Sequence, residues 1–268
     1  MVDPARYTHG HAESVLRSHR WRTVENSAAY LLPRLQPGTD VLDVGCGPGT
    51  ITIDIAQRVA PGRVVGIDAA PDAIAAARAA LDVADLGTVT LAVGDVFALD
   101  HDDDSFDVVH AHQVLQHLAD PEAALREMGR VCRPGGVVAA RDAIYRGMTW
   151  YPSSAALDRW LEVYCAVAEA NGGEPDAGSR LQAWAQAAGF EAVDASASAW
   201  CYATDDERAW WGGLWADRVT SSAFGVRAVE LGLATGADLA AVAEGWRSWA
   251  VHPDGWFGVL HGEILATP

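Results

Sequence analysis

The most constraining feature of the sequence is a regular alternation of short β-like runs and helical runs over residues 39–142. The β-like runs are short, rich in valine and bounded by glycine, proline or aspartate, which is typical of buried strands. Predicted strands cover residues 41–44, 63–68, 89–93, 106–111 and 137–140, and predicted helices cover 50–59, 71–81 and 121–131, with a turn at 133–136. Strands that alternate with helices in this way predict an α/β fold with a doubly wound, parallel sheet.

The alternation ends after residue 142. From there the sequence predicts helices within 145–176 and at 181–188, a strand at 190–202, a tryptophan-rich helical stretch at 205–250 and a last strand at 256–265. We therefore divide the chain into an N-terminal helical arm (1–34), an α/β core (35–142) and a C-terminal part (143–268). In the last part, the end of the sheet is expected to carry an inserted, tryptophan-rich helical cap.

The composition excludes several classes of function. The chain has 268 residues and a formal net charge of −17, and all 19 of its basic residues are arginines. Without lysine it cannot form a Schiff base, anchor pyridoxal phosphate or bind phosphate as a P-loop does. Because an excess of acid repels a phosphate backbone, we expect no nucleic acid among the partners.

The sequence also predicts where the protein is located. The N-terminus lacks the apolar stretch of a signal peptide, and every apolar run is too short to span a membrane. The four cysteines are scattered, and the His9/His11 and His110/His112 pairs lack carboxylate partners at a defined spacing. We expect a soluble, cytoplasmic protein with no membrane partner and no bound metal.

The first 34 residues differ in charge from the rest of the chain, since they carry five arginines against three acids. One interpretation is a solvated amphipathic helix around residues 12–32, with Val15, Leu16, Tyr30 and Leu31 facing inward. The other interpretation is an arm whose arginines bind an anion near the active site. The sequence leaves both open.

Three glycines and two aspartates predict a ligand-binding cleft. Gly45, Gly47 and Gly49 lie between the first strand and its helix, where glycine permits a sharp turn and close approach of a ligand to the main chain. The N-terminus of the following helix favours an anionic group such as a carboxylate. Asp68 and Asp95 end the next two strands, where carboxylates can accept hydrogen bonds from ribose and from an adenine amino group.

The chain resembles class I S-adenosylmethionine-dependent methyltransferases in five successive motifs: VLDVGCGPGT (41–50), GID (66–68), GDV (94–96), FDVVHAHQVLQHL (106–118) and RVCRPGG (130–136). It is most similar to the ubiquinone/menaquinone-biosynthesis-like group, of the methyltransferase domain 11/25 type. Its N-terminal run is also similar to some secondary-metabolite members. The resemblance implies a Rossmann-like, seven-stranded, mostly parallel sheet with an antiparallel last strand and a helical lid. It also implies S-adenosyl-L-methionine as the cofactor, bound by residues 35–142.

The resemblance further implies which residues contact the cofactor. It places Gly45, Cys46 and Gly47 at the methionine portion, Asp68 at the ribose, Asp95 and Val96 at the adenine, and Ala111 and His112 beside the sulfonium, and it adds Ala69 to the cofactor-binding residues. An N-terminal arm commonly covers the site in similar proteins. Tyr7, Trp21 and Arg22 are therefore candidates for contact with the cofactor or the acceptor, as is Tyr145.

Methyl transfer from a sulfonium to a nucleophile is an in-line displacement, so the protein mainly aligns and desolvates the two reactants. A base is needed only where the acceptor has to lose a proton. The candidates near strand ends are His110, His112, His117, Asp142 and Tyr145, and we select His112 because it falls at the end of its strand. The tryptophans after residue 145 indicate a small acceptor that is hydrophobic or aromatic.

Two other functions stay open, a nucleotide-dependent oxidoreductase on the same scaffold and a non-catalytic S-adenosylmethionine-binding protein. The glycine spacing G-x-G-x-G, in place of G-x-G-x-x-G, counts against the oxidoreductase. Because a fold does not determine a function, the non-catalytic protein is not excluded. The sequence also leaves open the acceptor, the atom that is methylated and the oligomeric state.

Overall fold

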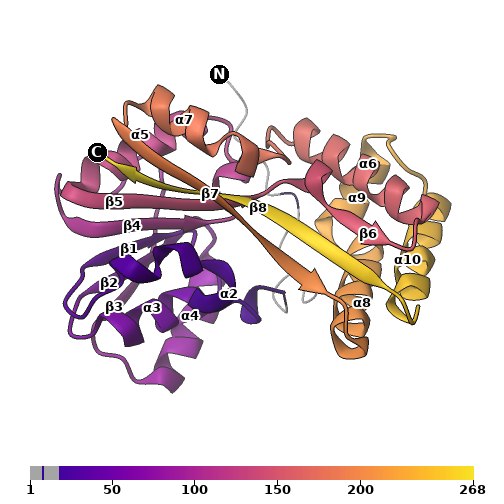
Figure 1. Ribbon diagram of the computed structural model, residues 1–268, viewed down its shortest axis with the longest axis horizontal. Coiled ribbons are helices and arrows are strands. Elements are labelled where there is room, and N and C mark those ends of the chain that lie inside the picture. Colours follow the sequence, from indigo (N-terminus) through magenta and orange to yellow (C-terminus); the bar gives the residue numbers. More distant parts are fainter. Residues whose placement is uncertain (1–7, 9–17) are drawn as a thin grey trace.

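The computed structural model describes Thr8 and residues 18–268. Its centre is an eight-stranded sheet with the strand order β3-β2-β1-β4-β5-β8-β6, and β7 also pairs with β8 (Figure 1). The strands are β1 (Val41–Val44), β2 (Val64–Asp68), β3 (Val89–Val93), β4 (Phe106–His112), β5 (Cys132–Ala143), β6 (Thr149–Tyr151), β7 (Ala192–Tyr202) and β8 (Trp256–Thr267). The pairs within β1 to β5 are parallel, whereas β8 is antiparallel to β5, β6 and β7.

This topology confirms the predicted Rossmann-like fold, with a mostly parallel sheet and an antiparallel last strand. The number of strands differs from the predicted seven, because β6 adds a short pairing with the start of β8. A strand of three residues, Thr149–Tyr151, is too short to show a period in the sequence. The turn predicted at 133–136 lies within β5, whose pairing with β4 shifts register at its beginning.

Helices cover both faces of the parallel part of the sheet (Figure 1). One face carries α2 (Val24–Ser27), α3 (Thr50–Val59) and α4 (Pro71–Ala84), and the other carries α5 (Pro121–Val131) and α7 (Leu181–Ala188). On the first face, Ile55 and Val59 of α3 pack against buried valines of the strands. On the second face, Leu125 and Met128 of α5 and Leu181 of α7 pack together against buried apolar residues of the strands. The sheet therefore lies between two apolar helical layers, and its strand ends remain available for a site.

The C-terminal part extends the sheet into a helical lobe. The β7–β8 pair runs beyond the core, and α6 (Ala155–Ala170), α8 (Asp205–Ser221), α9 (Ala223–Glu230) and α10 (Gly236–Ala250) gather around its far end (Figure 1). Their apolar faces enclose Trp160, Trp215 and Trp246, each less than 2% exposed. The helical stretch predicted for residues 205–250 is confirmed. In the part of the chain that the structure describes, no helix is long and apolar enough to cross a membrane.

The N-terminal segment differs from the continuous helix predicted around residues 12–32. Residues 18–20 are helical, a new helix α2 starts after Thr23, and the 3-10 helix η1 (Ala29–Arg34) follows a break at Ala28. The hydroxyl of Thr23 accepts a hydrogen bond from the Asn26 N–H and so caps α2, which ends the preceding turn. Leu31 is buried as predicted and Tyr30 is half-buried. Val15 and Leu16 lie outside the described residues.

Candidate active site

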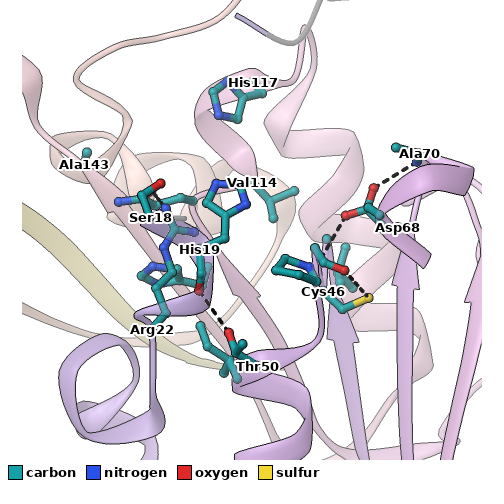
Figure 2. Close-up of a pocket in the computed structure, with 18 of the residues that line it drawn as sticks. Ser18, His19, Arg22, Cys46, Thr50, Asp68, Ala70, Val114, His117 and Ala143 are labelled. Atoms are coloured by element: carbon teal, nitrogen blue, oxygen red, sulfur yellow. Dashed lines mark hydrogen bonds between the residues drawn. The ribbon is translucent and has the colours of Figure 1, made fainter. Parts of the chain in front are cut away.

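A cavity of about 810 Å³ lies at the carboxyl ends of β1, β2, β3 and β4. Its walls come from the loops after these strands, from residues 18–22 and from the C-terminal lobe. Figure 2 shows Ser18, His19 and Arg22 on one side of this cavity, with Cys46 and Asp68 across from them. Open α/β sheets bind ligands at this edge, so the cavity is the candidate active site.

The glycine loop after β1 forms one wall with its main chain. Gly45, Gly47 and Gly49 have φ angles of +67°, +54° and +79°, in the left-handed region that favours glycine. A Cβ atom on Gly45 would lie 2.4 Å from Cγ2 of Val114, so no other residue fits there without a shift. The backbone N–H of Cys46 donates to the carbonyl oxygen of Ile67 at 2.9 Å, which fixes the loop against β2.

The two predicted aspartates line the same cavity as this loop. One carboxylate oxygen of Asp68 accepts the Gly47 N–H at 3.0 Å, and the other accepts the Ala70 N–H at 2.9 Å. Asp95 accepts the Phe97 N–H through Oδ1 at 2.9 Å. Asp68 therefore ties the glycine loop to the start of α4, and both carboxylates lie in the cleft where the sequence predicts them. Ala69 and Val96, beside them, also line the cavity.

The two histidines of β4 lie two residues apart and so on the same face of the strand. Nδ1 of His110 lies 2.8 Å from Oδ1 of Asp43, whose second oxygen accepts the Thr52 hydroxyl at 2.5 Å. His112 lines the cavity, is 5% exposed, and neither ring nitrogen has a hydrogen-bond partner among the described residues. Burial, Arg22 and Arg141 hold the pKa of His112 well below its usual value, so its imidazole is neutral at neutral pH.

One predicted cofactor contact is wrong. Ala111 is fully buried in the apolar core beneath the sheet, with Leu42 and Val109, and does not line the cavity. The reason is the two-residue period of a strand, because Ala111 points to the face opposite His110 and His112. The other residues predicted to contact the cofactor line the cavity, namely Gly45, Cys46, Gly47, Asp68, Ala69, Asp95, Val96 and His112.

The segment before α2 closes one side of the cavity. Trp21 and Arg22 line it, and the Thr50 hydroxyl donates to the carbonyl oxygen of His19 at 3.0 Å, which joins this segment to α3. Trp21 packs edge-on against Trp200 of β7 with ring centroids 5.3 Å apart. Arg22 donates to Oε1 of Gln113 at 2.6 Å. Tyr7, predicted for the same arm, lies outside the described residues.

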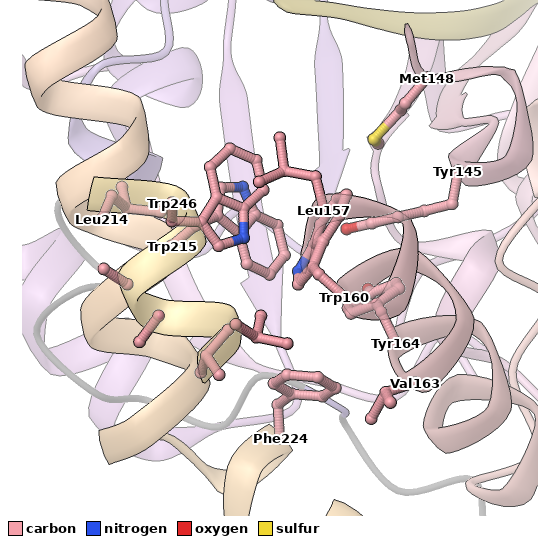
Figure 3. Close-up of a cluster of buried hydrophobic side chains, with 14 of the residues drawn as sticks. Tyr145, Met148, Leu157, Trp160, Val163, Tyr164, Leu214, Trp215, Phe224 and Trp246 are labelled. Atoms are coloured by element: carbon pink, nitrogen blue, oxygen red, sulfur yellow. The ribbon is translucent and has the colours of Figure 1, made fainter. Parts of the chain in front are cut away.

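The far end of the cavity is aromatic. Its wall is formed by Tyr145, Met148, Trp200, Tyr202, Trp210, Trp211 and Trp215. Tyr202 and Trp211 stack at 4.3 Å between ring centroids, and Tyr145 stacks on Tyr164 at 4.0 Å. Figure 3 shows Tyr145, Met148 and Trp215 among the packed side chains of the lobe's core. The tryptophan-rich stretch therefore supplies both the core of the lobe and one wall of the cavity.

The sequence interpretation missed several lining residues. Gln113 and Val114 follow β4 directly, and Gln113 adopts an unusual φ of +55°. His117, a candidate base that we did not select, also lines the cavity, and burial and Arg22 lower its pKa to about 3. Arg218 comes from α8, far along the chain, with its guanidinium 4.6 Å from the Trp215 ring centroid. The sequence carried a signal for Gln113 and Val114 alone among these residues, because they directly follow a predicted strand and so lie at its end.

The described residues hold no group of three or more His, Cys, Asp or Glu side chains arranged for a metal ion. The cavity instead combines a main-chain cradle, two acidic side chains and an aromatic wall. Such an arrangement fits a ligand with an amino-acid end, a nucleoside end and a reactive centre between them, facing an apolar partner.

Comparisons with known proteins agree with this geometry. The family model described as "Methyltransferase domain" matches residues 35–189. An uncharacterized methyltransferase of Schizosaccharomyces pombe is 32% identical, over 98% of this chain and 97% of that protein. A demethylmenaquinone methyltransferase of Listeria welshimeri is 39% identical, over 41% of this chain and 48% of that protein.

Solved structures show the same fold. The [4+2]-cyclase SpnF superposes with a TM-score of 0.55 at 21% identity, over 99% of this chain and 89% of the cyclase. The family model and the relative from Schizosaccharomyces pombe each span more than half of the chain. The chain therefore belongs to the methyltransferase domain family, and its resemblance to the S-adenosylmethionine-dependent methyltransferases is confirmed.

Proposed function

We propose that this methyltransferase moves the methyl group of S-adenosylmethionine to a small acceptor that is hydrophobic or aromatic. The observation that carries the proposal is one continuous cavity with two chemically different ends. The glycine loop, Asp68 and Asp95 form a polar end, and the rings of β7 and α8 form an apolar end. A sulfonium methyl group held between them faces the acceptor.

The polar end fits the cofactor. A side chain at Gly45 would collide with Val114, and the main chain of Gly45 lines the cavity without one. Asp68 and Asp95 each use one or both oxygens for backbone N–H groups, and each oxygen keeps a second lone pair for a ligand hydroxyl or amino group. We assign the methionine portion to Gly45, Cys46 and Gly47, the ribose to Asp68, and the adenine to Asp95 and Val96.

The apolar end fits the acceptor. Aromatic rings exclude water from the reacting groups, and their faces suit a cationic sulfonium whose charge disperses during the transfer. His112 lies at the junction of the two ends, with its imidazole neutral and its ring nitrogens unpartnered among the described residues. We assign it the role of base for an acceptor that must lose a proton, such as a phenol or a thiol.

The three parts of the chain have separate tasks in this proposal. We assign residues 1–34 the role of an arm, of which the described residues 18–22 line the cavity, residues 35–142 the binding of the cofactor, and residues 143–268 the end of the sheet and the aromatic cap for the acceptor. The contacts of Trp21 with Trp200 and of Arg22 with Gln113 support the role of the arm, since they join it to both other parts.

Binding and turnover test this proposal in two steps. In equilibrium dialysis, radiolabelled S-adenosylmethionine should bind and NADH should not; the reverse result would favour the oxidoreductase. Incubation with S-adenosylmethionine and a panel of aromatic hydroxyl, thiol and amino compounds should then yield methylated products by mass spectrometry. Cofactor binding with no product from any of these compounds would favour the non-catalytic protein.

A further inference from the structure

Three buried side chains lie next to the glycine loop and are joined by hydrogen bonds. Asp43 is the third residue of β1 and lies in register with His110 of β4. Nδ1 of His110 lies 2.8 Å from Oδ1 of Asp43. The hydroxyl of Thr52, in the first turn of α3, donates to Oδ2 at 2.5 Å. Two separate elements therefore fix the two oxygens of one carboxylate.

Of these three residues, Asp43 alone lines the cavity. His110, one of the candidates for the base, is fully buried behind it. His110 therefore does not touch a ligand in the cavity, and any effect that it has on binding passes through Asp43.

The contact between His110 and Asp43 has a fixed direction. An ionised carboxylate only accepts hydrogen bonds, so Nδ1 of His110 carries the proton. Nε2 of His110 is buried and has no hydrogen-bond partner in the described part of the chain. A proton on Nε2 would thus be a buried donor without an acceptor, which costs free energy. The imidazole therefore orients the Asp43 carboxylate and does not cancel its charge.

The charge of Asp43 has no other compensation within the described chain. His110 is the one basic side chain among the described residues that is in ion-pair contact with Asp43. The negative charge acts on the glycine loop, because burial and then the charges of Asp43 and Asp68 raise the pKa of the Cys46 thiol. A buried charge is costly unless it is paired, so this wall of the cavity favours a cation from the ligand.

The amino-acid end of the cofactor offers such a cation. It carries an ammonium group beside its carboxylate, and the free N–H groups at the start of α3 favour the carboxylate. Each oxygen of Asp43 accepts one hydrogen bond from the protein and keeps a second lone pair. The ammonium is therefore the part of the ligand that suits Asp43.

We propose that His110 is a positioning residue for the cofactor, because its hydrogen bond holds the Asp43 carboxylate ionised and oriented to bind the ammonium of S-adenosylmethionine. Thr52 fixes the second oxygen in the same way. His110 thus controls how firmly the amino-acid end is held, and with it the alignment of the sulfonium. This inference rests on the proposed function and gives a role in it to a side chain that touches neither reactant.

Calorimetry with two ligands tests the inference. The ligands are S-adenosylhomocysteine and its desamino analogue, in which a hydrogen atom replaces the ammonium group. The wild type should bind S-adenosylhomocysteine at least about tenfold more tightly than the analogue. His110→Leu, which removes the donor, should bind the two ligands within about threefold of each other and should keep the wild-type affinity for the analogue.

Two variants separate the hydrogen bond from the packing of the ring. His110→Asn places an amide N–H near the position of Nδ1 and should keep the wild-type preference. Thr52→Val replaces the second donor by a methyl group of the same size and should reduce the preference by at least about threefold, which tests the inference even where His110→Leu does not fold. His252→Leu makes the same change in the turn before β8, outside the cavity, and should bind like the wild type.

Four outcomes would overturn the inference. They are equal affinity of the wild type for the two ligands, an equal weakening of both ligands in His110→Leu, a preference that Thr52→Val leaves unchanged, and loss of the preference in a folded His110→Asn protein. Equal weakening would show that His110 only supports the packing of the sheet. A wild type that binds neither ligand would instead refute the proposed function.

Discussion

Replacement of Asp68 by alanine tests the cofactor end of the site most directly. The Asp68 carboxylate accepts the N–H groups of Gly47 and Ala70, and so it holds the glycine loop to the start of α4. In the proposed complex it also accepts from the ribose hydroxyls. The substitution therefore removes contacts to the ligand and leaves two backbone donors of the binding loop without their acceptor.

The magnitude follows from these contacts. A hydrogen bond to a charged group contributes about 1.5–3 kcal/mol, and part of the loss falls on the folded protein rather than on binding. We expect cofactor binding to weaken by about 1–3 kcal/mol, which raises the dissociation constant by roughly 5- to 150-fold. Isothermal titration with S-adenosylhomocysteine measures this change.

Asp82→Ala serves as the control for this experiment. Asp82 lies on the exposed side of α4 and does not line the cavity, yet its removal changes the net charge equally. This variant should bind S-adenosylhomocysteine like the wild type. If a folded Asp68→Ala protein binds within about twofold of the control, the role assigned to Asp68 is wrong.

Three further predictions concern other residues. His112→Ala should lower turnover by about 100-fold or more while S-adenosylhomocysteine affinity stays nearly constant. Because the pKa of His112 is held well below its usual value, wild-type turnover should remain level as the pH falls to about 6, and an inflection near pH 6.5 would contradict this environment. Gly45→Ala should lower the melting temperature and weaken S-adenosylhomocysteine binding, since the new Cβ meets Val114, whereas Gly87→Ala, with no atom within 4 Å, should do neither. Burial raises the pKa of Asp142 to about 8, far above that of the unfolded chain, so the contribution of Asp142 to the stability of the wild type should fall as the pH rises from about 4 through 8, in calorimetric melts compared with Asp142→Asn. Asp142→Asn, which cannot ionise, should reduce this slope, and parallel curves for the two proteins would refute the assignment.

The local order of the elements could be read from the sequence because it depends on local patterns. Apolar runs bounded by glycine and proline defined β1, β3 and α3 with the bounds that the structure has. The glycine loop and the two aspartates were also predictable, since a residue at a strand end reaches the edge of a parallel sheet whatever the rest of the chain does. Ala111 was misplaced because it was assigned from the resemblance, whereas the two-residue period of a strand sets it on the face opposite His112.

Other features depended on contacts between distant segments. The three residues of β6 form a strand only because β8 lies beside them, and the arm before α2 is fixed by Thr50 and Trp200 rather than by its own helical tendency. The sequence by itself determined the α/β order and the polar half of the cavity. Tertiary structure alone decided that Arg22, Gln113 and His261 meet, because they lie on separate elements and no local pattern relates their side chains.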